Sequence, residues 1–179
     1  DPDITTIGDM NLAVERAQFE APFISCKPLL RVDLKGCTKL TLVGNAAFAG
    51  CSSLTSVVLP DSLTQIGKAA FRECASLTSV VLPDNLRQIC LAAFQDCPSL
   101  ASVVLPDCLT QMGEDAFSEC TSLTSVVLPD SLIQIGKAAF GRCSSLASVV
   151  FPDSLTHVGD GAFRKCTSLT SVVLPDSLT

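Results

Sequence analysis

A pattern of apolar positions recurs every 23 residues along most of the chain. The proline that ends one apolar segment in each copy displays the period most simply, at Pro60, Pro83, Pro106, Pro129, Pro152 and Pro175. A fixed period of this length is typical of stacked repeats, in which one unit cannot bury its apolar face alone. The sequence therefore predicts a repeat solenoid.

Each copy contains two short extended segments. In the copy that spans residues 54–74, the apolar and β-branched segment 54–59 predicts a strand, which ends at Pro60 because proline cannot donate a ladder hydrogen bond. A second extended segment, residues 63–66, ends at Gly67, which suits a left-handed or tight turn. The helix-favouring residues 68–71 predict about one helical turn before the next strand.

We expect the copies to stack in register, so that each apolar residue lies on its equivalent in the next copy. Parallel strands would then lie about 4.8 Å apart. A fully buried large apolar side chain contributes about 1.5–3 kcal/mol, so contacts between neighbouring copies should dominate stability. The columns expected in the core include Phe48, Phe71, Phe94, Phe117, Phe140 and Phe163, and Cys26, Cys51, Cys74, Cys97, Cys120, Cys143 and Cys166.

The chain divides into an irregular start and a regular array. Residues 1–47 are interpreted as degenerate N-terminal repeats or a cap with an insertion, and residues 48–179 as the regular 23-residue array. The sequence begins at Asp1 rather than at methionine, and it stops at Leu178–Thr179, inside a repeat. Either a targeting segment has been removed or the sequence is part of a longer protein, and the end inside a repeat favours the second expectation.

The irregular start still follows the repeat pattern. Phe23–Leu34 matches residues 48–59 with an offset of 25. Ile4–Gly8 matches Leu63–Gly67, which predicts an extended segment of the second kind, and Asn11–Phe19 is a candidate for a short helix.

Composition narrows the functional classes. The chain is 47% hydrophobic with a mean hydropathy of +0.45, but Pro-Asp pairs interrupt its apolar runs long before the roughly 20 residues that a membrane span requires. It has a net charge of −6, no Trp and no Tyr. Nucleic-acid binding relies on basic patches and stacking aromatics, so the composition argues against a nucleic-acid partner.

The pattern Leu-x-x-Val-x-Leu-Pro-Asp-x-Leu-x-x-Ile-Gly-x-x-Ala-Phe-x-x-Cys resembles the BspA-type leucine-rich repeat, the 23-residue class. The resemblance implies an α/β-type but mostly β, right-handed solenoid with parallel strands on its concave face and short extended or helical turns on its convex face. Members of this family are mostly bacterial or protist surface proteins that bind host or matrix proteins, and long arrays also occur in unicellular algae. The resemblance implies no catalytic motif in this sequence. A shared fold indicates a general class of function but does not identify a binding partner.

The residues that suggest chemistry have structural interpretations. Seven of the ten cysteines belong to one column and are expected to act as small buried apolar residues. Cys37, Cys90 and Cys108 lie outside that column, and their oxidation state stays open. No Cys-x-x-Cys pair occurs, and the single histidine, His157, takes the place that glutamine has in other copies, so no metal site is expected. The aspartate after each proline is interpreted as turn chemistry rather than as a calcium ligand.

The outward positions of the predicted strands form the candidate partner-binding surface. With the apolar residues of each strand directed inward, a serine and a valine of each copy should face the concave side: Ser56, Val58, Ser79, Val81, Ser102, Val104, Ser125, Val127, Ser148 and Val150. An exposed contiguous apolar strip often marks an interface. The alternative is that these serines and valines have no binding role. The valines would then be present because they favour strands, and both residues would have been copied when the repeat was recently duplicated.

These observations predict a non-catalytic protein-interaction module without a cofactor, which binds through the concave sheet or through a variable charged edge. That edge consists of charged positions that differ between copies: Lys68, Arg72, Glu73, Asp96, Glu114, Asp115, Lys137, Arg142, Asp160, Arg164 and Lys165. The alternative is a structural or accessory subunit of a larger assembly, for example a photosynthetic membrane complex of an alga, attached to the membrane without spanning it. An enzyme is not expected, because no Ser/His/Asp, Cys/His or phosphate-loop constellation occurs. The resemblance implies a cell-surface or extracellular location, with an organelle-associated assembly as the alternative.

Overall fold

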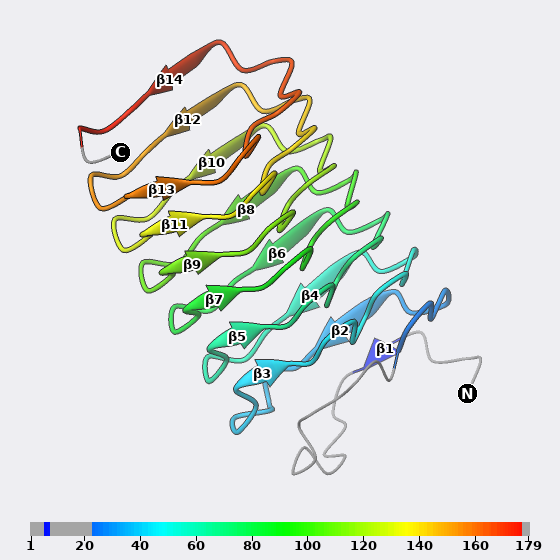
Figure 1. Cartoon of the computed structure of the whole chain (residues 1–179). Helices are drawn as coiled ribbons and strands as arrows, with labels where there is room; N and C mark the ends of the chain where they lie inside the picture. The colour runs from blue at the N-terminus through cyan, green and yellow to red at the C-terminus, as the bar shows by residue number, and fades with distance from the viewer. Residues whose placement is uncertain (1–5, 8–22, 177–179) are drawn as a thin grey trace.

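The computed structural model describes residues 6–7 and 23–176, which wind into a parallel β-solenoid (Figure 1). Successive copies of the repeat form successive turns, and each turn lies beside the next along one axis. The predicted repeat solenoid is therefore confirmed. The candidate helix Asn11–Phe19 lies outside the described residues.

The first extended segment of each copy contributes one strand to an eight-stranded parallel sheet. Its strands follow one another in the order β1 (Thr6–Ile7), β2 (Arg31–Asp33), β4 (Ser56–Val58), β6 (Ser79–Val81), β8 (Ser102–Val104), β10 (Ser125–Val127), β12 (Ser148–Val150) and β14 (Ser171–Val173). Equivalent residues pair, as in Val57↔Val80. This sheet corresponds to the one that the resemblance places on the concave face.

The second extended segment forms a narrower, six-stranded parallel sheet on another side of the solenoid. Its two-residue strands are β3 (Leu42–Val43), β5 (Gln65–Ile66), β7 (Gln88–Ile89), β9 (Gln111–Met112), β11 (Gln134–Ile135) and β13 (His157–Val158). Each strand directs one residue inward and one outward, as Gln111 and Met112 illustrate: Gln111 is exposed and Met112 is buried. The sequence alternation of polar and apolar residues explains this arrangement.

The core consists of columns of equivalent residues. The phenylalanines from Phe23 to Phe163 stack with ring centroids 5.1–5.5 Å apart and interplanar angles of 3–10°. Phe71, Phe94 and Phe117 are fully buried within this column. Each ring contacts the rings of the preceding and following turns, so stability depends on neighbouring copies as expected.

The segment after Gly67 is not the helical turn that its composition predicts. Ala69 and Glu73 have positive φ angles of 54° and 60°, which interrupt a right-handed helix. The backbone N–H of Phe71 donates to the carbonyl of Ala93 in the next copy at 2.8 Å rather than to a residue of its own copy. Alternate N–H groups of this segment thus bond to the next copy, while those of Ala70 and Arg72 bond within their own copy. No helix occurs in the described part of the chain.

Two further expectations need correction. Gly67 does not adopt a left-handed conformation; instead, a Cβ atom there would lie 2.7 Å from the carbonyl oxygen of Val43, so close backbone approach explains the glycine. The segment Ile4–Gly8 was expected in the second sheet, but β1 pairs with β2 in the first sheet through Thr6↔Arg31 and Ile7↔Val32. A Thr-Ile pair suits either sheet, because both alternate polar and apolar positions, so the pattern alone did not discriminate.

Candidate interaction surfaces

The outward-facing residues of the first sheet form one continuous strip. We call these residues the Ser/Val strip: Ser56, Val58, Ser79, Val81, Ser102, Val104, Ser125, Val127, Ser148 and Val150. In the repeated Ser-Val-Val strand the middle valine is buried, so the serine and the last valine share the outer face. Val81, Val104 and Val127 are 74%, 78% and 77% exposed. The strip is therefore an accessible surface with a regular line of apolar side chains.

Threonines beside the strip have their hydroxyl groups engaged. The Oγ1 of Thr55 donates to the carbonyl of Leu30 at 2.9 Å, and the Oγ1 of Thr78 donates to that of Thr55 at 3.4 Å. The same contact recurs between Thr124 and Ala101. These hydroxyls already bond to the preceding copy, so the threonines make the strip less polar than free hydroxyl groups would.

Charge enters this surface only toward the N-terminal side of the described array. Arg31 and Asp33 are exposed in β2 and pair in register with Ser56 and Val58. The sequence interpretation missed both residues, because an insertion separates them from the regular copies. The offset of 25 that aligns Val32 with Val57 was the available signal.

Six of the seven cysteines in the column are buried as predicted, whereas Cys26, at its N-terminal end, is half-buried. The buried thiols donate to the phenylalanine carbonyl of the preceding copy: Cys74 Sγ to Phe48 O at 3.2 Å and Cys97 Sγ to Phe71 O at 3.1 Å. Burial raises the pKa of Cys97 to about 12, since a thiolate loses its hydration there. A raised pKa and buried sulfur make these thiols poor nucleophiles and poor metal ligands.

The remaining candidate residues stay apart from one another. Cys108 is exposed, whereas Cys37 and Cys90 are half-buried, and all ten cysteines are free thiols in this structure. His157 is exposed, as its exchange with glutamine predicts. Within residues 23–176, no three His, Cys, Asp or Glu side chains gather in a way that could hold a metal ion. No helix of the described residues is long and apolar enough to cross a membrane.

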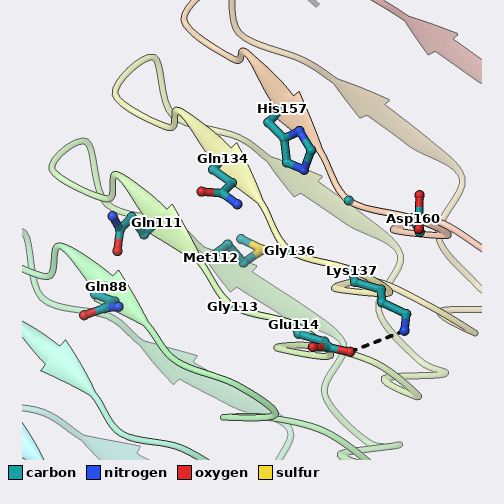
Figure 2. A pocket seen from close by; sticks show the side chains of 11 residues that line it. Gln88, Gln111, Met112, Gly113, Glu114, Gln134, Gly136, Lys137, His157 and Asp160 are labelled. Carbon is teal, nitrogen blue, oxygen red and sulfur yellow. Dashed lines mark ion pairs between the residues drawn. The ribbon is translucent and has the colours of Figure 1, made fainter. Parts of the chain in front are cut away.

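A second surface is a groove on the outer side of the second sheet (Figure 2). The sequence interpretation named Glu114, Lys137 and Asp160 among the variable charged positions but did not predict the groove. We call it the Gln/Gly groove; it has a volume of about 520 Å³ and is lined by Gln88, Gln111, Met112, Gly113, Glu114, Gln134, Gly136, Lys137, His157, Gly159 and Asp160. The repeated sequence Gln-x-Gly-x, with a charged residue last in three copies, was the available signal.

The comparison with known families decides how the chain is classified. Residues 20–144 and 87–179 match the BspA type leucine rich repeat region, with six copies. The chain belongs to the BspA-type leucine-rich repeat family. No curated protein matches the sequence of this repeat protein.

Solved structures of bacterial leucine-rich repeat proteins are similar to this repeat protein. The leucine-rich repeat protein of T. pallidum is 34% identical, with a TM-score of 0.74, over 83% of this chain and 69% of that one. A leucine-rich repeat protein from Bacteroides ovatus is 29% identical, with a TM-score of 0.59, over 78% of this chain and 42% of that one. A leucine rich cell surface protein from Faecalibacterium prausnitzii shares the fold at 22% identity and a TM-score of 0.58, over 88% of this chain and 70% of that one.

Proposed function

We propose that this repeat protein is a non-catalytic interaction module that holds a protein partner on the Ser/Val strip. The observation that carries the proposal is the line of valines, each more than three-fifths exposed from Val81 to Val150, on strands that carry no charged side chain. Monomeric proteins rarely leave contiguous apolar surface in water, and such surface often marks an interface. The leucine-rich repeat fold is one that proteins typically use for such interactions.

The strip also defines the chemistry of the partner. Valine has few rotamers, so its burial in an interface loses little side-chain entropy. A matching partner surface presents apolar side chains along a line, with small hydroxyl-bearing or uncharged groups opposite the serines. Arg31 and Asp33, beyond Val58, provide charge of both signs at one side only. Charge placed this way sets the orientation of a partner more than its affinity.

The test compares two variants of equal charge. Val104→Glu places one carboxylate in the centre of the strip, whereas Ile133→Glu places one on an exposed apolar position outside it. The partner is first identified by mass spectrometry of proteins that co-purify with the tagged parent chain from its native source. We expect the strip variant to lose that partner and Ile133→Glu to retain it, with both variants unchanged in circular dichroism.

An unchanged yield of the partner with the strip variant would contradict the proposal. A second function, that of a structural subunit in a larger assembly, gains support from the same exposed valines, because a permanent interface is more apolar than a transient one. Size-exclusion chromatography distinguishes the two. A recognition module elutes alone as a monomer and binds reversibly, whereas a subunit is recovered with its complex in a fixed stoichiometry.

A further inference from the structure

The Gln/Gly groove has two walls and a floor that come from consecutive positions of each repeat (Figure 2). Gln88, Gln111, Gln134 and His157 follow one another along one side, and Glu114, Lys137 and Asp160 along the other. Gly113 and Gly136 lie between them, and Gly159 has the equivalent position in the next copy. The groove therefore runs along the axis of the solenoid, across β7, β9, β11 and β13.

The floor is glycine because no side chain fits there. A Cβ atom at Gly136 would lie 2.4 Å from the carbonyl carbon of Gly113, and one at Gly159 would lie 2.4 Å from the nitrogen of Lys137. Contacts this short exclude any larger residue without a shift of backbone. The packing of the repeats thus creates a channel of bare backbone bordered by polar side chains.

The glutamine amides in this groove have no protein partner. Gln65, in the same column but outside the groove, donates its Nε2 to Cys90 Sγ at 3.2 Å. Among the described residues, the side chains of Gln88, Gln111 and Gln134 make no such bond, although each carries two donors and an acceptor. They pair in register, Gln88↔Gln111↔Gln134↔His157, so they offer one amide or imidazole group per repeat.

The spacing and charge of these groups select among ligand classes. Parallel strands lie about 4.8 Å apart, whereas an extended peptide advances about 3.3 Å per residue and would fall out of step with the amides. The opposite wall carries two carboxylates and one ammonium group, and Lys137 Nζ already lies 3.7 Å from Glu114 Oε1, so this wall disfavours a polyanion. Met112 is the sole apolar side chain of the lining and it is buried, which disfavours an apolar ligand.

We propose that the Gln/Gly groove binds a linear, uncharged oligosaccharide of β-1,4-linked hexopyranose units that lies along the solenoid axis. Such a chain advances per sugar by close to the spacing of neighbouring strands, so successive sugars meet successive glutamines. Sugar hydroxyls both donate and accept hydrogen bonds, as the amides do. The bare glycine floor lets the sugar ring approach the backbone. This site is separate from the Ser/Val strip and does not depend on it.

Nuclear magnetic resonance with ¹⁵N-labelled protein tests the proposal, and the probes are cellohexaose and maltohexaose. Both are glucose hexamers, but the β-1,4 chain is extended and the α-1,4 chain coils. We expect cellohexaose to shift the backbone signals of Gly113, Gly136 and Gly159 and the side-chain NH₂ signals of Gln111 and Gln134. Maltohexaose at the same concentration should leave them in place.

A pair of variants locates the binding site by affinity. Gln111→Ala combined with Gln134→Ala removes two amides from the centre of the groove and should weaken cellohexaose binding at least tenfold. Gln65→Ala, from the same column outside the groove, should leave the affinity unchanged. The ligand-induced shifts of the parent chain remain decisive if the double variant does not fold.

Three results would overturn the proposal. The first is an absence of any shift in the parent protein at the solubility limit of cellohexaose. The second is a set of shifts confined to the Ser/Val strip. The third is equal binding of maltohexaose, which would mean that the spacing of the glutamines does not select an extended chain.

Discussion

The buried cysteine column should make this solenoid sensitive to alkaline pH. Cys74, Cys97, Cys120 and Cys143 are each fully buried and donate to the backbone of the preceding copy. Burial raises the pKa of Cys97 and of Cys143 to about 12 from an ordinary value of 9.0, and it raises the pKa of Cys74 and of Cys120 as well. In the unfolded chain these thiols ionise at their ordinary pKa, so raising the pH favours unfolding.

The sign and size of the effect follow from proton linkage. A folded-state pKa above the unfolded value gives stability that is complete below pH 9 and is lost as the pH rises toward 12. Each pKa unit corresponds to about 1.4 kcal/mol, and between pH 9 and pH 10 one thiol of this kind loses about 1 kcal/mol. Four such thiols lower the free energy of unfolding by about 4 kcal/mol over that interval, against a total of about 5–15 kcal/mol for a typical domain.

Urea denaturation followed by circular dichroism at pH 8, 9 and 10, under reducing conditions, measures this loss. Cys97→Ala should reduce the loss between pH 9 and pH 10 by about 1 kcal/mol, whereas Cys108→Ala removes an exposed thiol and should leave it unchanged. Groups that the three proteins share contribute equally to the loss and cancel in the comparison. A Cys97→Ala protein that loses as much stability as its parent would refute the reasoning.

Three other substitutions test the packing, each by the urea midpoint at pH 7. Phe94→Ala opens a cavity in the fully buried phenylalanine column and should lower the free energy of unfolding by about 3–5 kcal/mol; a loss below about 1 kcal/mol would contradict column packing. Gly136→Ala forces a Cβ against the preceding copy and should destabilise by at least about 1–3 kcal/mol, whereas Gly36→Ala, with no atom within 4 Å, should be tolerated. Asp96→Gly relieves a positive φ of 56° and should raise the free energy of unfolding by a few tenths of a kcal/mol to about 1 kcal/mol. The control Asp84→Gly, at a position without positive φ, should lower it. A change of the same sign in both variants would rule out the strain argument.

Periodicity predicts the columns of this protein well, because stacking in register determines which residues of neighbouring copies lie next to one another. Once Val57 and Val80 are recognised as equivalent, the exposure of Val58 and Val81 follows from the alternation of side chains along a strand. The burial of the cysteines follows in the same way from their fixed step. What periodicity does not provide is the local backbone conformation between the strands.

That limitation explains the errors. Ala69 favours a helix in isolation, but the N–H of Ala69 donates to the carbonyl of Leu91 in the next copy, a contact that no property of a single segment reveals. For Gly67 the sequence suggested a left-handed or tight turn, whereas the close backbone approach that explains it depends on the position of the neighbouring copy. The Gln/Gly groove was not predicted for the same reason, since its glycines are required by how near the preceding copy lies to Gly136.

Because equivalent residues of neighbouring copies pair with one another, whole copies are also interchangeable. Removing residues 79–101, one complete unit, would bring Ser102 beside Ser56 and Phe117 beside Phe71, and nearly every core contact would be restored between new neighbours. Recombination between copies at the gene level can therefore shorten or lengthen the array in steps of 23 residues while keeping it folded. Each such event also changes the length of the Ser/Val strip and of the groove, so that the reach of this protein toward a long partner can evolve without any change in the side chains that meet it.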